Sequence, residues 1–367
     1  MNIITKQFKD LDLKYDLSHI APLEDILFID IETTGFSPAA TVLYMIGCAY
    51  YDGITFSCKQ FFAEKPEEEP EILKTFLDSV RKYKVLIHFN GNNFDIPYIQ
   101  EKCKKYGFPC PLYSMVGIDL YKRISPYKNF LKVPNCKQKT IEQYLGIDRR
   151  DEMNGGELVG VYQEYVTHFD VDALTKLLIH NEEDIRGMIE ITPILAYSEI
   201  FKEKLTVTKV SMDKYSDHQG DEKAELVMKI KLPAALPQSI THMALGCYFK
   251  GEGKEGILKV PVYAGELKYF YANYKDYYYL PEEDEALHKS VASFVDKDHR
   301  VQAQASNCYT RVESIFVPEW DLSFTPFYKK DYLSKEIFLE MTDERKKDRE
   351  FFSDYASHVL GFISTLT

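Results

Sequence analysis

Two carboxylates interrupt a run of apolar residues near the start of the sequence, which reads LFIDIETTGF from Leu27 onward. Side chains alternate between the two faces of a β-strand, so Asp30 and Glu32 point to the same side. Two negative charges held this close repel each other, and burial increases the cost. A cation between them removes the repulsion. An acidic pair on a solvent-exposed strand end needs no cation, so the pair alone leaves both interpretations open.

Two further motifs carry carboxylates. In HFNGNNFDIPYIQEK, a strand ends near Asn90 and Asp95 falls near the start of a helix, where the helix dipole favours a carboxylate. A simple helix cap would look the same. In LLIHNEEDIRGM, His180 and Asp184 are four residues apart and therefore share one face of a helix. A salt-bridged or solvated helix face is the alternative for this pair.

The elements that position these residues follow from the hydrophobic pattern. Residues 26–62 predict an antiparallel meander of three strands with a turn at Asp52-Gly53. Beyond them the pattern predicts a helix over 71–82, a short strand KVLIHF, helices over 93–106 and IEQYLGI, and a long or broken helix over 172–200. A meander followed by helices alternating with strands is the order expected for an α/β ribonuclease H-like mixed sheet flanked by helices, although the periodicity alone does not select this fold over other α/β folds.

In order and type, the three motifs resemble those of the DEDD-type 3′-to-5′ exonucleases, which have a ribonuclease H-like fold. FIDIET resembles the first motif, and Asn90-x-x-x-Phe94-Asp95 resembles the second. His180-x-x-x-Asp184 has the spacing of the Tyr-x-x-x-Asp subclass, with His in place of Tyr. The segment KQKTIEQYLGIDRRDEMNGGELVGVYQEY is similar to the bacterial ribonuclease H-like predicted exonucleases. The resemblance covers about residues 20–200.

This resemblance implies a site with two divalent metal ions, Mg²⁺ or Mn²⁺, held by the four acids. Asp30 would bridge both ions, Glu32 and Asp184 would complete the site that activates water, and Asp95 would hold the ion at the leaving group, through water. Two such ions lie about 4 Å apart and stabilise the attacking and departing oxygens, and both metals prefer oxygen ligands. Because an imidazole titrates near neutral pH, His180 is expected to act as a general base.

Residues beside the motifs are expected to contact the substrate. Thr33, Thr34 and Gly35 would let backbone amides approach a terminal nucleotide, and Asn90 of the second motif is assigned to the same surface. Either Phe36 or Phe94 would stack on a base. Turn formation and core packing explain most of these residues equally well.

The net charge of −12 would disfavour nucleic acid if charge were spread evenly, but its local distribution matters more. Residues 101–150 carry eleven Lys and Arg against four Asp and Glu. Within this segment Lys137 and Lys139 are predicted to contact phosphates. A solvated loop with scattered lysines is the alternative.

The length of 367 residues suits two domains. We expect an N-terminal extension over 1–20, a ribonuclease H-like domain over 21–200, and a β-rich, α+β C-terminal domain of unknown role over 201–367. In the last domain the pattern predicts alternating strands from Leu205, a helix near 283–295 and a final helix near 334–363. The tyrosine-rich stretch YFYANYKDYYYL is interpreted mainly as core and cross-strand packing, with base stacking as the alternative.

Seven scattered cysteines without a Cys-x-x-Cys pair favour reduced thiols over a disulfide framework or a zinc site. The N-terminal residues lack a signal-peptide core, and no uncharged apolar run approaches the length of a membrane span. The protein is therefore expected to be cytoplasmic, without a membrane partner.

These observations predict a hydrolase: a metal-dependent 3′-to-5′ exonuclease acting on a single strand or a 3′ end of DNA or RNA. An endonuclease or a nuclease of structured RNA on the same fold is the nearest alternative. A binding module, in which the nuclease domain is only a scaffold, is the alternative from another class. No protein partner is indicated.

Overall fold

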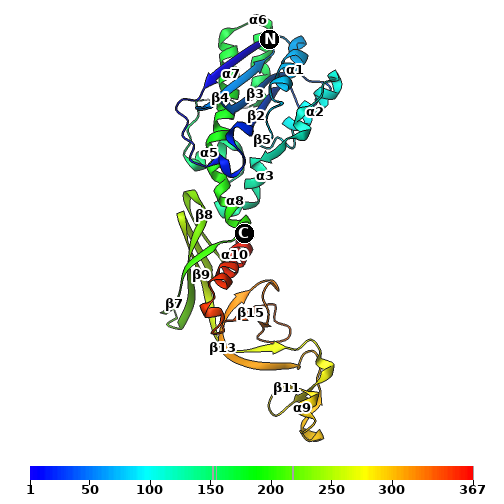
Figure 1. The fold of residues 1–367 in the computed structure, drawn as a ribbon, viewed down its shortest axis with the longest axis vertical. Helices are drawn as coiled ribbons and strands as arrows, with labels where there is room; N and C mark the ends of the chain where they lie inside the picture. Colours follow the sequence, from blue (N-terminus) through cyan, green and yellow to red (C-terminus); the bar gives the residue numbers. More distant parts are fainter. Residues whose placement is uncertain (151–152, 154, 217–218, 367) are drawn as a thin grey trace. The chain divides into compact units, whose positions relative to one another are not determined.

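The computed structural model describes residues 1–150, 153, 155–216 and 219–366. The chain divides into two compact units, Met1–Ser198 and Glu199–Thr367, a division close to the expected boundary at residue 200 (Figure 1). The residues expected to form an N-terminal extension contribute the edge strand β1 (Asn2–Gln7), which pairs with β4 (Phe56–Phe62). Residues 1–20 therefore lie within the first unit.

A six-stranded mixed sheet forms the centre of the first unit, in the order β1-β4-β3-β2-β5-β6. The first four strands in this order pair antiparallel, and β2–β5 and β5–β6 pair parallel. The remaining strands are β2 (Ile26–Thr33), β3 (Leu43–Tyr51), β5 (Val85–His88) and β6 (Val116–Asp119). The predicted meander followed by a short strand is confirmed, and the structure adds that this strand pairs parallel with β2.

Helices cover both faces of this sheet (Figure 1). Alternation along β2 sends Leu27, Ile29 and Ile31 into a core with α1 and α2. The opposite face of the sheet packs against α6 and α7 through a second core that contains Tyr44 and Phe62. The helices of this part of the chain are α1 (Glu69–Ser79), α2 (Asp95–Tyr106), α3 (Leu120–Ile124), α4 (Lys128–Leu131), α5 (Gln138–Leu145), α6 (Gly155–His168), α7 (Val171–Glu190) and α8 (Leu195–Lys202).

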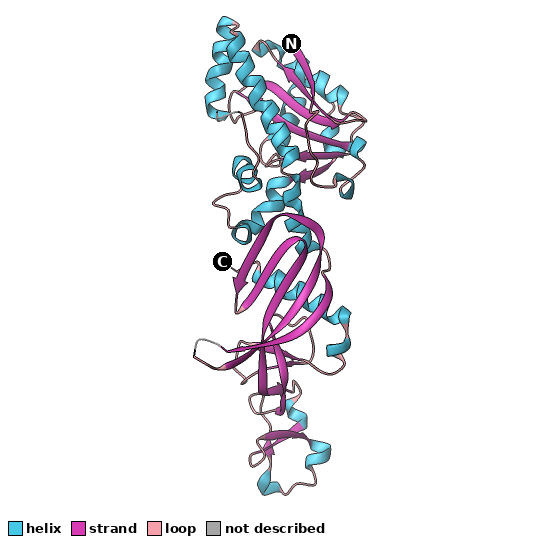
Figure 2. Cartoon of the chain, turned by 90° about the vertical axis from the view of Figure 1, so that its left-hand side faces the viewer, coloured by secondary structure: helices cyan, strands magenta, loops and turns pink. Residues whose placement is uncertain are grey.

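The second unit is rich in antiparallel strands, as the sequence predicts (Figure 2). Its six-stranded sheet has the order β14-β15-β13-β9-β8-β7, and a smaller sheet has the order β11-β10-β12. Helix α10 packs against β7, β8 and β9. The elements are β7 (Thr206–Ser216), β8 (Glu222–Ala244), β9 (Cys247–Phe270), β10 (Tyr277–Leu280), β11 (Glu285–His288), α9 (Lys289–Ala292), β12 (Val301–Gln302), β13 (Tyr309–Glu319), β14 (Phe327–Tyr328), β15 (Ile337–Glu340) and α10 (Arg349–Ile363).

Two helix predictions in this unit are wrong in part, although the final helix does exist as α10. Only α9 of the predicted helix over 283–295 is helical, because Glu285–His288 pairs with β10. The first part of the predicted helix over 334–363 is the strand β15, which pairs with β13 and β14. The final helix begins after Asp348, whose side chain accepts hydrogen bonds from the backbone N–H groups of Glu350 and Phe351.

The tyrosine-rich stretch packs mainly on itself, in agreement with the favoured interpretation. The rings of Tyr271 and Tyr277 stack with 4.5 Å between their centroids. Asp284 accepts hydrogen bonds from the hydroxyls of Tyr279 and Tyr309. Within the described residues, none of the helices has both the length and the apolar composition needed to cross a membrane.

Candidate active site

The two carboxylates of β2 face helix α7, as strand alternation predicts. Asp30 Oδ2 accepts a hydrogen bond of 3.0 Å from Asn181 Nδ2 on α7. Asn181 is fully buried, and Gln60 Nε2 of β4 donates a bond of 3.1 Å to its Oδ1. The sheet therefore holds the amide in the orientation that donates to Asp30.

Gly47 makes room for this amide. It lies opposite Asp30 in the β2–β3 ladder, and a Cβ atom on Gly47 would be 2.0 Å from Asn181 Oδ1. A larger residue here would displace Asn181 and with it the donor to Asp30.

Helix α7 also supplies His180 and Asp184 from one face, as their spacing predicts. His180 Nε2 lies 3.2 Å from Asp184 Oδ2 and 3.8 Å from Glu32 Oε1. Each of these three residues offers one possible ligand atom, and the three atoms all lie within 4.8 Å of one another. Residues about 150 positions apart in the sequence thus form a compact group of atoms able to bind a metal.

Asp95 joins this site from the start of α2. Its Oδ1 accepts a hydrogen bond of 3.2 Å from the backbone N–H of Ile31, between the two carboxylates of β2. The preceding loop turns at Asn90, which has a φ of 58° and donates its backbone N–H to Asp119 Oδ1 at 2.9 Å. Asp119 therefore stabilises the turn that delivers Asp95 to β2.

The four acids perturb one another. Burial raises the pKa of Asp30 well above its ordinary value, and the charges of Glu32, Asp184 and Asp95 add to the effect. Burial raises the pKa of Glu32 to about 8, against the opposing charge of His180. Burial likewise raises the pKa of Asp95 to about 7. Three of the four carboxyls are therefore poor anions in the absence of a cation.

Asp184 behaves differently because cationic groups contact it. Burial by itself would raise its pKa, but the hydrogen bond from His180 and the charge of Arg149 outweigh burial and lower the pKa of Asp184. Arg149 Nη2 lies 2.6 Å from Asp184 Oδ1, and Nη1 donates to both oxygens of the buried Glu142. The sequence placed Arg149 only among the bases of segment 101–150, so its position at the site is a new finding.

A family comparison matches this part of the molecule. Residues 27–196 match the model of the RNase_H superfamily. The fold of this segment is therefore ribonuclease H-like, and we refer to the segment as the RNase H domain. The predictions of a mixed sheet flanked by helices and of a ribonuclease H-like fold are therefore confirmed.

Other similarities are more distant. A DNA polymerase of Methanocaldococcus jannaschii is 36% identical over 44 residues, which are 12% of this chain and 3% of the polymerase. The structure of the family B DNA polymerase from Pyrobaculum calidifontis superposes with a TM-score of 0.38 and 14% identity over 68% of this chain and 35% of that one. E. coli exonuclease I in complex with a dT13 oligonucleotide gives a TM-score of 0.32 and 12% identity over 57% and 55%. The chain thus spans only part of each of these proteins.

The donor set of the RNase H domain fits divalent cations. Buried carboxylates with raised pKa values lose their mutual repulsion when a cation binds, and oxygen ligands suit Mg²⁺ and Mn²⁺. Glu32, His180 and Asp184 form one ligand group, and Asp30 and Asp95 lie beside it. No comparable group of three or more such side chains occurs elsewhere among the described residues.

The residues expected to contact the substrate have diverse surroundings. Thr33 Oγ1 donates to the carbonyl of Gly35 at 2.8 Å, and Thr34 Oγ1 accepts from the N–H of Val42 at 2.9 Å, so both hydroxyls support the loop after β2. Asn90 Oδ1 accepts from Asn93 Nδ2 at 2.8 Å.

In each predicted pair of substrate contacts, Phe36 and Phe94 or Lys137 and Lys139, one side chain is more exposed than the other. Phe36 is 91% exposed and meets the ring of Phe94 edge to face at 5.9 Å. Lys137 is exposed at the start of α5, whereas Lys139 Nζ donates to the carbonyl of Met153 at 2.5 Å. Phe36 and Lys137 are therefore the more accessible members of their pairs.

Much of the positive charge of segment 101–150 is balanced by acids elsewhere in the RNase H domain. Lys102 is fully buried and lies 2.5 Å from Glu69 Oε1. Arg150 pairs with Glu182 and Glu183 of α7. Other basic side chains of the segment are exposed and make no ion pair within the described part of the chain: Lys122, Arg123, Lys128, Lys132 and Lys137.

Gly47→Ala should disrupt the site although Gly47 is not one of the proposed metal-binding residues. The added methyl group displaces Asn181, removes the donor to Asp30 and lowers the free energy of unfolding by about 1–3 kcal/mol, as overpacking of a core does. Gly160→Ala is the matched control, because a Cβ atom there meets nothing within 4 Å on helix α6. Thermal unfolding of both variants checks this, and a Gly47→Ala protein as stable as the control would contradict it.

The pH dependence of stability without metal should reveal Glu32. Its pKa rises from an ordinary 4.5 to about 8 on folding, so the folded state binds the extra proton. This contribution is fully present below pH 4.5 and is lost as the pH rises through 8. We expect the melting temperature in EDTA to fall across this window, and to fall less in Glu32→Gln. Glu164→Gln, an exposed substitution on α6, should follow the wild type. Parallel curves for all three proteins would contradict the prediction.

Proposed function

We propose that this protein is a metal-dependent 3′-to-5′ exonuclease that hydrolyses phosphodiester bonds of DNA or RNA with two divalent ions. One observation carries the proposal: Asp30, Glu32, Asp95 and Asp184 meet with His180 in an RNase H domain. The motifs that resemble those of DEDD-type exonucleases supply the direction of cleavage. A scaffold without catalysis has no use for four clustered acids, three of which have raised pKa values.

The roles of the residues follow from their positions. Bound divalent ions would activate water and neutralise the charge that develops on the phosphate and the departing oxygen. Glu32 and Asp184 would hold one ion, Asp95 would hold the other, and Asp30 would contact both; the imidazole of His180 lies beside this set and is not assigned as a ligand. Arg149 and Asn181 keep the carboxylates of Asp184 and Asp30 in fixed orientations.

His180 is the proposed general base. Its Nε2 faces Glu32 and Asp184, at 3.8 and 3.2 Å, so a proton accepted at this nitrogen produces an imidazolium next to two carboxylates. That environment stabilises the charged form and favours transfer of the proton from water.

The substrate is expected to lie over the loop after β2. The exposed ring of Phe36, with Phe94 beneath it, offers a surface on which a terminal base would stack. Backbone groups of Thr33, Thr34 and Gly35, the turn at Asn90 and the bases Lys137 and Lys139 complete the proposed contacts.

End-labelled oligonucleotides test the function directly. With Mn²⁺, a 5′-labelled single strand should yield a ladder that shortens one nucleotide at a time from the 3′ end, and parallel DNA and RNA substrates report the sugar preference. Immediate release of the 5′ label would reverse the proposed direction. Internal fragments at early times would instead indicate an endonuclease.

Removal of a metal-binding carboxylate should abolish hydrolysis without unfolding the protein. Asp30→Ala or Asp184→Ala should lower the rate by a factor of about 1,000 or more, since each acid is needed to stabilise transition-state charge. Asp12→Asn, an exposed substitution in the same unit, should keep wild-type activity. Single-turnover cleavage with Mn²⁺ measures the rates. Wild-type turnover by either alanine variant would rule out the proposed ligand set.

The pH profile tests His180 as the base. At saturating Mn²⁺, the logarithm of the single-turnover rate should rise with pH until the imidazole is neutral and then become level. His180→Gln should be slower by a factor of about 100 to 10,000, the usual contribution of general base catalysis, and should lack this inflection. If the inflection persists in the glutamine variant, another group carries it.

A further inference from the structure

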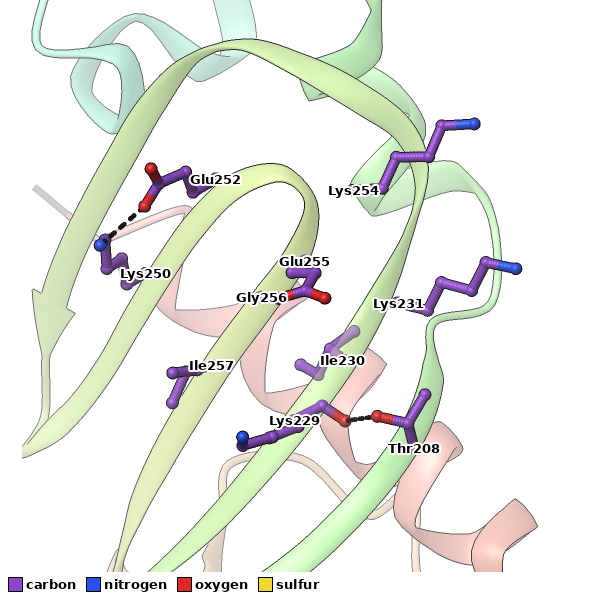
Figure 3. Close-up of a pocket in the computed structure, with 10 residues that line it drawn as sticks. All are labelled: Thr208, Lys229, Ile230, Lys231, Lys250, Glu252, Lys254, Glu255, Gly256 and Ile257. Atoms are coloured by element: carbon purple, nitrogen blue, oxygen red, sulfur yellow. Dashed lines mark hydrogen bonds and ion pairs between the residues drawn. The ribbon is translucent and has the colours of Figure 1, made fainter.

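The second unit contains a hollow of about 650 Å³ over strands β7, β8 and β9 (Figure 3). Four lysines line it, two from β8 and two from β9, with two glutamates between them. The charged lining residues are Lys229, Lys231, Lys250, Lys254, Glu252 and Glu255. This concentration is unusual in a segment, 199–367, that holds more acidic than basic residues.

Strand alternation puts the lysines of β8 on the open face of the sheet. Lys229 and Lys231 are exposed, whereas Ile230 between them is 2% exposed and points into the core. Figure 3 shows Lys231 and Lys254 extending away from their strands, while Lys250 turns to Glu252 at 2.8 Å. Lys229, Lys231 and Lys254 make no ion pair within the described part of the chain.

Two smaller hollows continue the basic lining around the edge strand β7. They have volumes of about 560 and 280 Å³, and both share Thr208 with the first. The smallest is lined by Lys209, Lys347 and Arg349, for which the described residues likewise provide no ion-pair partner, and by Phe352 of α10. We call the lining of the three hollows the β7 surface. It carries nine basic and three acidic residues.

The β7 surface passes from one side of the sheet to the other. Lys229 and Lys231 lie on the open face, and Arg349 and Phe352 belong to α10, which packs on the opposite face. Figure 3 shows that helix behind the strands. A ligand that occupied all three hollows would therefore bend around the edge of the sheet.

We propose that the β7 surface binds the phosphate backbone of single-stranded nucleic acid. Repulsion among neighbouring lysines costs stability, and a polyanion relieves it by replacing condensed counterions with protein cations. Duplex DNA has a persistence length of about 50 nm, too stiff to turn around one strand, whereas a single strand follows such a path. Because the charged contacts are lysines and arginine, the binding is expected to be independent of sequence.

This inference rests on the proposed function, because it assigns the second unit to the same polymer that the RNase H domain would cleave. It adds a site whose residues are separate from the carboxylates and from segment 101–150. The two proposals can therefore fail independently.

Binding of a fluorescein-labelled dT20 strand to the full chain in EDTA tests the inference. The probe variant is Lys229→Gln/Lys231→Gln/Lys254→Gln. Loss of three phosphate contacts should reduce the slope of log affinity against log salt by about 2, and should lower the affinity about 10- to 100-fold near 0.1 M salt. The matched control is Lys275→Gln/Lys297→Gln/Lys335→Gln, which removes three exposed lysines of the same unit. It should leave both quantities nearly unchanged.

Each other outcome overturns the inference. Unchanged affinity in the probe variant, or equal losses in both variants, would show that the β7 surface is not the binding site. Competition by poly-L-glutamate at the same charge concentration as effectively as by unlabelled dT20 would assign the surface to an acidic polypeptide. Equal competition by duplex DNA would contradict the single-strand assignment.

A small substrate tests the proposed nuclease activity separately from strand binding by the β7 surface. Hydrolysis of the p-nitrophenyl ester of thymidine 5′-monophosphate with Mn²⁺ needs only the RNase H site. The ester carries a single phosphate, so it cannot offer the β7 surface the several phosphates of a strand. The probe variant should hydrolyse it at the wild-type rate. Strand binding that depends on the three lysines, without any hydrolysis of the ester, would support the inference and contradict the nuclease.

Discussion

Mutual repulsion among four carboxylates, two of them buried and two half-buried, is the constraint around which the RNase H domain is organised. Asp30 and Glu32 occupy one face of a central strand, and Asp95 and Asp184 approach it from two helices. The fold offsets part of this repulsion with hydrogen-bond donors. Asn181 donates to Asp30, the N–H of Ile31 donates to Asp95, and Arg149 with His180 contacts Asp184. Burial still keeps three of the four pKa values high, and in the proposed function bound cations would remove the remaining repulsion.

The supporting residues show how much of the core serves this arrangement. Gln60 orients Asn181, and Gly47 leaves space for it. On the other side of α7, a Cβ atom at Gly187 would lie 2.1 Å from Glu142 Oε1, so this glycine admits the carboxylate that holds Arg149. Small residues on a strand and a helix thus permit close approach of polar groups, which a core selected for stability alone would replace with apolar contacts.

The sequence was sufficient for those parts of the site that depend on local geometry. Alternation predicted that Asp30 and Glu32 share a face, and the spacing of four residues predicted that His180 and Asp184 do so on a helix. Asn181, Gln60, Gly47 and Arg149 were not predicted, because their roles depend on which strand faces which helix. An asparagine next to a predicted catalytic histidine was the one local signal available.

The two helix predictions in the second unit were wrong over their first residues for a related reason. The segments 285–288 and 337–340 are short and mix charged with apolar residues, so their periodicity is ambiguous. Pairing with β10 and β13 decides their conformation. The basic surface of the same unit could not be predicted from the sequence. Its basic residues, which come from β7, β8, β9 and the start of α10, are far apart along the chain and meet only after the sheet forms.

The most direct test of the central claim is calorimetric titration of Mn²⁺ into the full chain at pH 6.5, in two buffers with different ionisation enthalpies. Burial keeps the pKa of Glu32 at about 8 and that of Asp95 at about 7, so both carry protons at this pH. Cation binding must release these protons. The account predicts that Mn²⁺ binds with net release of protons. In Asp30→Asn, the affinity for Mn²⁺ should be much lower and fewer protons should be released. Absence of Mn²⁺ binding, or binding with no proton released, would contradict it.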